Sequence, residues 1–371
     1  MSSVPGQMNA QLPSLRTDMT LGRSVFVIAE AGSNWRMGTP DRDRQMARAL
    51  VQVAVEAGAD AVKFQTYRAR DTYVVDAGAS DYLADLGIHR SINEIFIDLE
   101  MPYDLVGEIA AHCEQVGIEF MSTPFSVADA EAVDPYVRRH KVASYEINHV
   151  RLLQWLAATG KPLIISTGAA AEDDIEFCLT TVREAGARDI TLLQCTSSYP
   201  APPDSLNLTV IPHLSQRFGV PAGFSDHSRD PIVGPVAAVA LGATVIEKHF
   251  TLDNRLPGPD HPFAVEPEEL AAMVRSIRDA EQARGDGVKT VGSHETELRR
   301  FAVRTIQATR NLAPGDPLVE GDNIDVLRPG KRSVGMHPRH LEALRGRHAA
   351  RNIVAGEGIC PDDVLPPIAD A

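Results

Sequence analysis

Residues 53–65, VAVEAGADAVKFQ, join a helix to a strand through Gly58, and this arrangement repeats along the chain. A helical stretch ends in glycine, which supplies the left-handed residue that closes a helix, and a short apolar run follows. Similar stretches surround Gly117 (HCEQVGIEFMSTP), Gly160 (WLAATGKPLIISTG), Gly186 (VREAGARDITLLQC) and Gly242 (AVALGATVIEKHF). The apolar runs do not alternate with polar residues, which is typical of parallel strands buried on both faces.

Extending this repeat in both directions predicts eight strands, most of them followed by a helix. The predicted strands are residues 25–30, 61–65, 118–122, 141–146, 163–166, 190–194, 221–225 and 244–249. Thr39 and Pro40 are typical of a helix N-cap and first turn, and the helix they begin carries an apolar stripe from Met46 to Ala54. Eight β/α units over about 265 residues predict a TIM (β/α)8 barrel. The alternative is a doubly wound open sheet, but no GxGxxG turn follows the first strand.

The pattern changes after residue 265. Residues 266–287, EPEELAAMVRSIRDAEQARGDG, predict an amphipathic helix that ends in a glycine-rich break. Short β-like runs then follow, separated by turns in NLAPGDPL, VLRPGKRS and NIVAGEGI. We therefore expect a loose tail over residues 1–20, a barrel over 21–285, a linker over 286–300 and a small, mostly β domain over 301–371.

The composition excludes several classes of partner. A net charge of −14 argues against nucleic acid and anionic membranes, although a locally basic pocket can still bind a small anion. The four cysteines, Cys113, Cys178, Cys195 and Cys360, form no CxxC pair, which fits a reducing cytoplasm. The N-terminus has no apolar signal region, and the longest apolar run, residues 231–246, is too short to span a bilayer. We expect a cytoplasmic protein.

The predicted strands end in polar or ionisable residues, and in a TIM barrel these ends form the active site. The residues are Glu30, Lys63, Gln65, Ser122, Thr123, Lys141, Ser144, Glu146, Ser166, Thr167, Gln194, Thr196, Ser197, Ser225, Asp226, His227, Glu247, Lys248 and His249. Lys63 and Lys141 leave apolar strands and need anionic partners, and the neighbouring hydroxyls suit phosphate or carboxylate oxygens. This favours an anion site. The alternatives are ion pairs with a neighbouring glutamate and a Schiff-base lysine.

His227 and His249 lie at the ends of consecutive predicted strands, which places two imidazoles side by side. They predict half of a metal site, and the alternative is a pair of hydrogen-bonded core histidines. Asp226, Glu247 and Asp260 are nearby and would support the imidazoles or add an oxygen ligand. Because HExxH and cysteine-based zinc signatures are absent, we expect a weakly held Mn²⁺ or Mg²⁺ with open positions for substrate.

Several stretches together resemble the sialic acid (N-acetylneuraminate) synthases and their relatives for other nonulosonic acids. They are VFVIAEAGSN, AGADAVKFQTY, FMSTPF, ISTGAA, CTSSYPAP, GFSDHS and ALGATVIEKHFTLDNRLPGPDH. The C-terminal stretch RNLAPGDPLVEGDNIDVLRPGKRSVGM is similar to the SAF domain of that family, which resembles type III antifreeze protein. The resemblance covers roughly residues 22–366.

The resemblance implies a transferase that condenses phosphoenolpyruvate (PEP) with the open-chain aldehyde of an amino sugar such as N-acetylmannosamine. The products are a 2-keto-3-deoxy nonulosonic acid and phosphate, and the metal acts on the acceptor aldehyde. The resemblance assigns the PEP carboxylate to Lys63 and Ser166, and the phosphate to Lys141, Thr123, Ser144, Ser197 and Ser225. Glu30 and Glu146 become candidates to act on water and on acceptor hydroxyls, while Gln65, Tyr199 and Asp260 match acceptor-binding positions.

The resemblance also implies a homodimer in which the SAF domain reaches over the partner's barrel, where Arg328 touches the acyl-amino group of the acceptor. Two stretches depart from the family. Asn34-Trp35-Arg36-Met37-Gly38 replaces the usual NHNG, so we expect Trp35 and Arg36 to alter acceptor choice and Arg36 to suit an acceptor with a carboxylate or phosphate. Ser144-Tyr145-Glu146 replaces the common SGE.

Three alternative functions stay open at this point. The first is the same condensation on a different acceptor sugar, for a specialised metabolite or a surface glycan. The second is a metal-dependent TIM-barrel isomerase or hydrolase, which would not need the paired lysines. The third is a non-catalytic protein that binds through the SAF domain, for example at ice.

Overall fold

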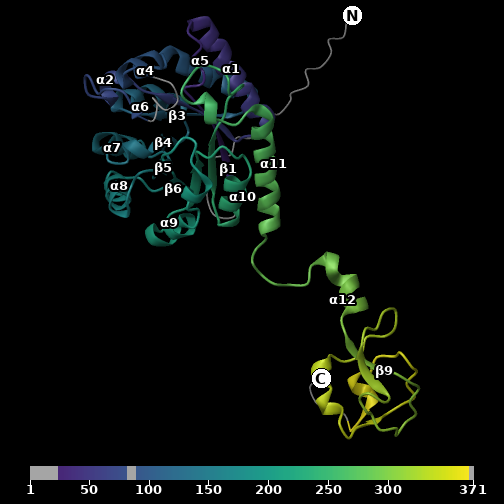
Figure 1. Ribbon diagram of the computed structural model, residues 1–371. Coiled ribbons are helices and arrows are strands. Elements are labelled where there is room, and N and C mark those ends of the chain that lie inside the picture. Colours follow the sequence, from purple (N-terminus) through teal and green to yellow (C-terminus); the bar gives the residue numbers. More distant parts are fainter. Residues whose placement is uncertain (1–23, 82–88, 367–371) are drawn as a thin grey trace, which may run out of the picture. The chain divides into compact units, whose positions relative to one another are not determined.

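A computed structural model describes residues 24–81 and 89–366, so the tail predicted over residues 1–20 lies outside the described residues. The chain divides into two compact units, one ending at Gly285 and the other beginning at Asp286. In the first unit, eight parallel strands form one sheet in the order β3-β2-β1-β8-β7-β6-β5-β4, and helices surround it (Figure 1). The predicted (β/α)8 barrel is confirmed as a nearly closed barrel of this type.

The elements of the first unit alternate as the sequence predicts. The strands are β1 (Phe26–Gly32), β2 (Ala61–Thr66), β3 (Glu119–Pro124), β4 (His140–Val142), β5 (Leu163–Ser166), β6 (Ile190–Cys195), β7 (Ala222–Asp226) and β8 (Val245–His249). The helices are α1 (Pro40–Ala57), α2 (Ala69–Thr72), α4 (Ile92–Asp98), α5 (Tyr103–Val116), α6 (Val127–Val133), α7 (Val150–Ala158), α8 (Glu172–Glu184), α9 (Val210–Phe218), α10 (Val233–Ala240) and α11 (Pro267–Arg284).

Helix α1 shows why the repeated sequence folds this way. It begins at Pro40, directly after Thr39 in the N-cap position, and it ends at Gly58 in the left-handed conformation (φ 81°). Its buried face includes the predicted stripe from Met46 to Ala54, which packs against the outside of the sheet. The helix boundaries predicted from the sequence are confirmed here.

The interior of the barrel explains where the polar residues lie. A small apolar cluster consists of Phe26, Ile28, Ala61, Met121, Ile164, Leu193 and Val245. Because side chains alternate along a strand, a residue two positions after a member of this cluster faces the same side of the sheet. Those residues are Glu30, Lys63, Thr123, Ser166, Cys195 and Glu247. The interior is therefore apolar along its stem and polar at the carboxyl end of the strands.

One predicted strand is too long. The prediction extends the fourth strand to Glu146, but β4 ends at Val142 and Ser144–Glu146 forms a 3-10 turn. The backbone N–H of Glu146 donates to the carbonyl of Ala143 at 3.1 Å, which is a turn contact rather than a bond to a neighbouring strand. The turn carries Ser144 and Glu146 at the end of the barrel.

The second unit is small and built around short strands. It contains α12 (Thr296–Ala302), β9 (Thr305–Ala308), β10 (Ile324–Leu327), β11 (His348–Ala349) and β12 (Val364–Leu365). Its core includes Ile306, Ile324 and Ile359, which agrees with the predicted small, mostly β domain. The stretch predicted as a linker, 286–300, also contains a 3-10 turn at Ser293–Glu295 and the start of α12.

Within the described parts of both units, no helix has the length and apolar character needed to cross a membrane.

Candidate active site

A cavity of about 460 Å³ opens at the carboxyl ends of the barrel strands. The resemblance and the histidine pair together assign fifteen residues to the site. Twelve of them line this cavity: Glu30, Lys63, Gln65, Thr123, Lys141, Ser144, Glu146, Ser166, Tyr199, Ser225, His227 and His249. They come from every strand of the barrel or from the segment directly after it. The strand-end pattern therefore converges on one pocket.

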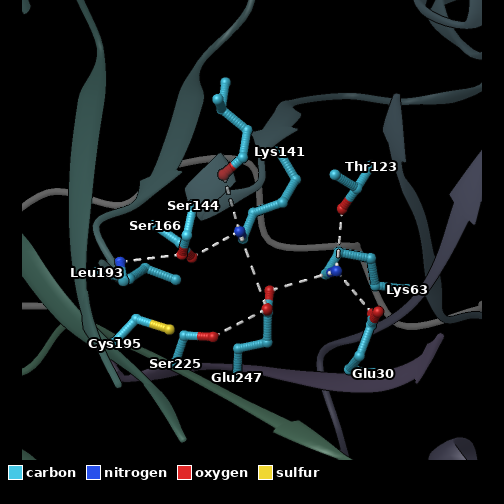
Figure 2. A network of polar contacts seen from close by, with 12 residues as sticks. Glu30, Lys63, Thr123, Lys141, Ser144, Ser166, Leu193, Cys195, Ser225 and Glu247 are labelled. Atoms are coloured by element: carbon cyan, nitrogen blue, oxygen red, sulfur yellow. Dashed lines mark hydrogen bonds and ion pairs between the residues drawn. The ribbon is translucent and has the colours of Figure 1, made fainter. Parts of the chain in front are cut away.

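A buried cluster of two lysines and two glutamates forms the floor of this pocket (Figure 2). Lys63 Nζ lies 2.6 Å from Glu30 Oε2 and 3.7 Å from Glu247 Oε2. Lys141 Nζ lies 3.9 Å from Glu247 Oε1. Glu247 thus lies between the two ammonium groups and compensates the charge of both. The sequence analysis gives lysine–glutamate ion pairs as the alternative to an anion site, and such pairs are present here.

Hydroxyl groups complete the floor. Lys63 Nζ donates to Thr123 Oγ1 at 3.0 Å, and Lys141 Nζ donates to Ser166 Oγ at 2.7 Å. Ser225 Oγ donates to Glu247 at 3.1 Å. The resemblance assigns Lys63 and Ser166 to the PEP carboxylate, and Lys141 and Thr123 to its phosphate. The observed hydrogen bonds instead join Lys63 to Thr123 and Lys141 to Ser166. All four groups nevertheless face one small volume.

Ser144 and Ser197 converge on Gly168, next to this floor. Ser144 Oγ accepts a hydrogen bond from the Gly168 N–H at 3.0 Å. A side chain at Gly168 would place its Cβ 2.4 Å from Ser197 Oγ, so only glycine allows these hydroxyls to approach. Ser197 Oγ is buried without a hydrogen-bond partner among the described residues, and Ser197 is not one of the residues that line the pocket.

The two glutamates of the floor ionise differently. Burial raises the pKa of Glu30 to about 7, even though Lys63 opposes the shift. Burial would also raise the pKa of Glu247, but Lys141 and Lys63 together hold it below its usual value. Burial lowers the pKa of Lys141. Glu247 is therefore the stronger acid of the two, and burial makes Glu30 the weaker one.

The two histidines lie beside each other at the ends of β7 and β8, with ring centroids 5.5 Å apart. His227 Nδ1 donates to the carbonyl of Thr196 at 2.8 Å, and its Nε2 lies 3.9 Å from the thiol sulfur of Cys195. His249 Nδ1 is buried and has no hydrogen-bond partner among the described residues. Burial lowers the pKa of each imidazole to about 3, so both are neutral at physiological pH.

These features fit a divalent cation. Neutral imidazoles are common metal ligands, and a buried nitrogen without a partner, such as His249 Nδ1, is not typical of a hydrogen-bonded core histidine. Within residues 24–81 and 89–366, no set of three His, Cys, Asp or Glu side chains is arranged to hold a metal. A cation on His227 and His249 would therefore keep open positions for substrate oxygens.

The remaining predicted residues lie in three different places. Gln65 Nε2 donates to Glu30 at 3.1 Å, and the Tyr199 ring lies against His227 with centroids 4.2 Å apart. Asp260 is outside the pocket lining, where its carboxylate accepts hydrogen bonds from the backbone and side chain of Ser33. Arg328 belongs to the second unit, in the segment directly after β10.

The structure places neither Trp35 nor Arg36 in the pocket lining, which does not support the direct contact with the acceptor expected for Arg36. Trp35 is buried in the core between the sheet and its helices. The Arg36 guanidinium lies 2.6 Å from Asp43 and 3.1 Å from Asp98. Both side chains are therefore occupied away from the pocket, and Arg36 is not available to an acceptor carboxylate or phosphate.

Comparison with known proteins agrees with this geometry. The NeuB family matches residues 50–289, and the SAF domain matches residues 303–365. The chain belongs to the NeuB family. The spore coat polysaccharide biosynthesis protein SpsE of Bacillus subtilis is 41% identical over 93% of this chain and 95% of its own length. Its crystal structure superimposes with a TM-score of 0.61, at 39% identity, over 94% of this chain and 97% of that one.

Two further relatives carry enzyme names. The N,N'-diacetyllegionaminic acid synthase of Legionella pneumophila is 38% identical, over 90% of this chain and 92% of its own length. A pseudaminic acid synthase of Campylobacter jejuni is 34% identical, over 95% of this chain and 99% of its own length. The chain is accordingly an enzyme of the sialic acid synthase type, with a NeuB barrel and a SAF domain, as the sequence predicts.

Some residues of this NeuB pocket have a role or a position that the sequence does not predict. Glu247 is predicted at a strand end, as support for the histidines or as an oxygen ligand, whereas it lies between the two lysines. Glu247 and His249 are two residues apart on β8, so they face the same side of the sheet. This spacing is the sequence signal that places Glu247 in the pocket. Tyr73, Phe96, Phe125 and Tyr145 also line the pocket. Tyr73 and Phe96 lie in the part of the β2–β3 connection that precedes α5, where no strand end marks them.

Lys248 anchors the segment that carries His227. It points away from the NeuB pocket and is 1% exposed. Its Nζ donates to Asp226 Oδ2 at 2.7 Å and to the carbonyl of Asp230 at 2.9 Å, and it also bonds to Ser228. One buried ammonium group thus holds the whole turn after β7.

Replacing Lys248 with methionine is expected to destabilise the protein by about 3–5 kcal/mol, because Asp226 is left buried without its charged partner. Urea unfolding measures this change in the free energy of unfolding. The double variant Lys248→Met/Asp226→Asn should recover part of the loss, since it removes both charges. A single variant as stable as the wild type would show that the pair does not hold the turn.

Proposed function

We propose that this NeuB-family enzyme condenses PEP with an N-acylamino aldose to give a 2-keto-3-deoxy nonulosonic acid and phosphate. The observation that carries the proposal is the placement of two kinds of site in one pocket. A lysine and hydroxyl floor suits a small anion with a carboxylate and a phosphate, and two neutral imidazoles beside it suit a cation. The names of the relatives support the same chemistry.

Binding of PEP would use the floor residues. Lys63 and Ser166 would hold its carboxylate, while Lys141, Thr123, Ser144, Ser197 and Ser225 would hold its phosphate. Charge-assisted hydrogen bonds from lysine are among the stronger polar contacts in proteins. They would fix C3 of PEP toward the acceptor, so that the two reacting carbons meet in a defined geometry.

Condensation then joins PEP C3 to the acceptor aldehyde carbon and leaves positive charge at C2. Water adds at C2, and the resulting tetrahedral intermediate loses phosphate through cleavage of the C2–O bond. A Mn²⁺ or Mg²⁺ on His227 and His249 would supply Lewis-acid polarisation of the aldehyde. Glu30, Gln65 and Tyr199, which line the pocket, would orient the acceptor hydroxyls, and Asp260 would have to act from outside the lining.

Glu146 would accept a proton from the attacking water. Glu30 is engaged by Lys63 and Gln65, whereas Glu146 Oε2 is buried without a hydrogen-bond partner among the described residues. Burial raises the pKa of Glu146 to about 7, against the opposing effect of Lys141. The carboxylate form that can accept a proton therefore exists mainly above pH 7.

We expect kcat to fall about tenfold per pH unit below pH 7, because the protonated acid cannot act as a base. Glu146→Gln should lower kcat by about 10²–10⁴-fold and abolish this acidic limb. Glu30→Gln is the matched control and should keep the limb. An unchanged acidic limb in Glu146→Gln would remove Glu146 from this role.

The direct test uses the purified protein with PEP, Mn²⁺ and a panel of N-acyl aldoses. Phosphate release and product mass should show one acceptor-dependent product, whose mass equals that of the aldose plus one pyruvic acid. No phosphate release with any aldose would contradict the proposal. Full activity of Lys63→Ala would instead favour a metal-dependent isomerase or hydrolase. The identity of the sugar would decide between a sialic acid and a product for a specialised metabolite or surface glycan.

The proposal includes a cytoplasmic homodimer in which the SAF domain of one protomer completes the site of the other through Arg328. Arg328→Ala should then raise the acceptor KM far more than the PEP KM. A mixture of Arg328→Ala and Lys141→Met chains should regain activity, because a mixed dimer contains one intact site. Equal effects on both KM values, or no regain in the mixture, would contradict this arrangement.

A further inference from the structure

The ends of β7 and β8 carry a second pair of charged residues, on the side of the sheet opposite the pocket. Asp226 and Lys248 are partners in the β7–β8 register, and they directly precede His227 and His249 in the chain. Because side chains alternate along a strand, a strand end that turns its histidine toward the pocket turns the preceding residue away from it. Asp226 and Lys248 are each 1% exposed. This ion pair therefore lies buried behind the two imidazoles.

Lys248 joins the end of β8 to the end of β7 and to the turn after it. Its Nζ donates to Asp226 Oδ2 at 2.7 Å, to Ser228 Oγ at 3.2 Å and to the carbonyl of Asp230 at 2.9 Å. Asp226 Oδ1 accepts a hydrogen bond from the Ser228 N–H at 2.8 Å. Since Lys248 directly precedes His249, one ammonium group ties the place of His249 on β8 to the end of the neighbouring strand.

Helix α10 packs closely on this ion pair at Gly234. A Cβ at Gly234 would lie 3.0 Å from Asp226 Oδ2 and 3.2 Å from the ring of Phe224, both tighter than ordinary contact. The missing side chain therefore allows the helix to lie directly against the carboxylate. With the helix on one side and Lys248 on another, the carboxylate has little room to move.

We infer that Asp226 and Lys248 are positioning residues, which set how the two imidazoles are placed relative to each other. The affinity of His227 and His249 for a divalent cation then depends on this pair, although neither member contacts the cation. The inference rests on the proposed function, in which the cation binds both histidines. Among the residues that the structure describes, no third His, Cys, Asp or Glu completes a metal-binding set with them. The orientation of two imidazoles therefore decides the affinity.

Titration with Mn²⁺, followed by electron paramagnetic resonance, tests this role without any need for turnover. Lys248→Met/Asp226→Asn removes both charges, and it should bind Mn²⁺ about 10–100-fold more weakly than the wild type, the loss typical of residues that support metal ligands. Glu119→Gln/Arg139→Met is the matched control. Arg139 Nε lies 2.7 Å from Glu119 Oε1, and this pair is as deeply buried, but it lies where β3 and β4 begin. The control should keep wild-type Mn²⁺ affinity even where urea unfolding shows reduced stability.

Gly234→Ala tests the same role while every hydrogen-bonding group stays in place. The added methyl group presses on the Asp226 carboxylate and should weaken Mn²⁺ binding, by less than the double variant does. Gly107→Ala on α5 is the matched control, since its Cβ would lie 3.0 Å from the hydroxyl of Tyr136, outside the pocket. It should leave Mn²⁺ affinity unchanged. Alanine favours a helix over glycine, so both variants are expected to fold.

Wild-type Mn²⁺ affinity in Lys248→Met/Asp226→Asn would overturn the inference, and so would an equal loss in the Glu119→Gln/Arg139→Met control. If the double variant does not fold, unchanged affinity in Gly234→Ala overturns it instead. Absence of Mn²⁺ binding by the wild type would overturn it together with the metal site. Failure of the proposed function gives a different result, because phosphate release would be absent with every aldose while the Mn²⁺ titrations still decide the inference.

Discussion

Replacing Lys141 with methionine is expected to lower kcat/KM for PEP by about three orders of magnitude. The variant loses charge-assisted hydrogen bonds to the phosphate, and each such bond contributes about 1.5–3 kcal/mol. A thousandfold loss in kcat/KM corresponds to about 4 kcal/mol. It also leaves Glu247 with Lys63 as its remaining ammonium partner in the cluster. Steady-state kinetics of phosphate release measure the effect.

Inorganic phosphate separates the roles of the two lysines. If Lys141 holds the phosphate, competitive inhibition by inorganic phosphate should be lost in Lys141→Met and kept in Lys63→Met. Lys161→Met is the matched control, because Lys161 pairs with Asp134 outside the pocket and should leave PEP kinetics unchanged. Equal loss of phosphate inhibition in both pocket variants would contradict the division of PEP between them.

Removing the divalent cation is expected to abolish turnover, and Mn²⁺ should restore it. His227→Ala and His249→Ala should each weaken Mn²⁺ binding by at least about 10–100-fold, because each removes one of two imidazole ligands. Titration of the protein with Mn²⁺, followed by electron paramagnetic resonance, measures binding without reference to activity. The same variants should still bind PEP, since the lysine floor is intact.

His213→Ala is the matched control for the histidine variants. His213 is exposed on α9 and bonded to Glu172, so its loss should leave Mn²⁺ affinity unchanged. Phosphate release that is indifferent to EDTA would contradict a metal-dependent reaction. Wild-type Mn²⁺ affinity in both pocket variants would show that the two histidines are not ligands.

The barrel and most of its pocket follow from local sequence patterns. Glycine-terminated helices and unbroken apolar strands predict the alternation of helices and strands. Because every second side chain of a strand faces the same side, the polar residues at the strand ends, such as Glu30 and Lys63, are predicted to share one pocket. His227 and His249 follow from the same reasoning. These features depend on residues close together in sequence, which is why they can be predicted.

Features that depend on distant partners could not be predicted in this way. Arg36 departs from the family pattern, but its direction is set by Asp43 and by Asp98 at the end of α4. The position of Glu247 between two lysines depends on the closing of β8 against the strands around it. The strand β4 ends at Val142, and the 3-10 turn after it carries Ser144 to Gly168, which follows β5.

The most direct test of the central claim follows one oxygen atom. PEP labelled with ¹⁸O at the oxygen between C2 and phosphorus is turned over with Mn²⁺ and an accepted aldose, and the released phosphate is weighed by mass spectrometry. If water adds at C2 and the C2–O bond breaks, the phosphate carries the label. Unlabelled phosphate would show cleavage of the P–O bond and would contradict the condensation proposed for this pocket.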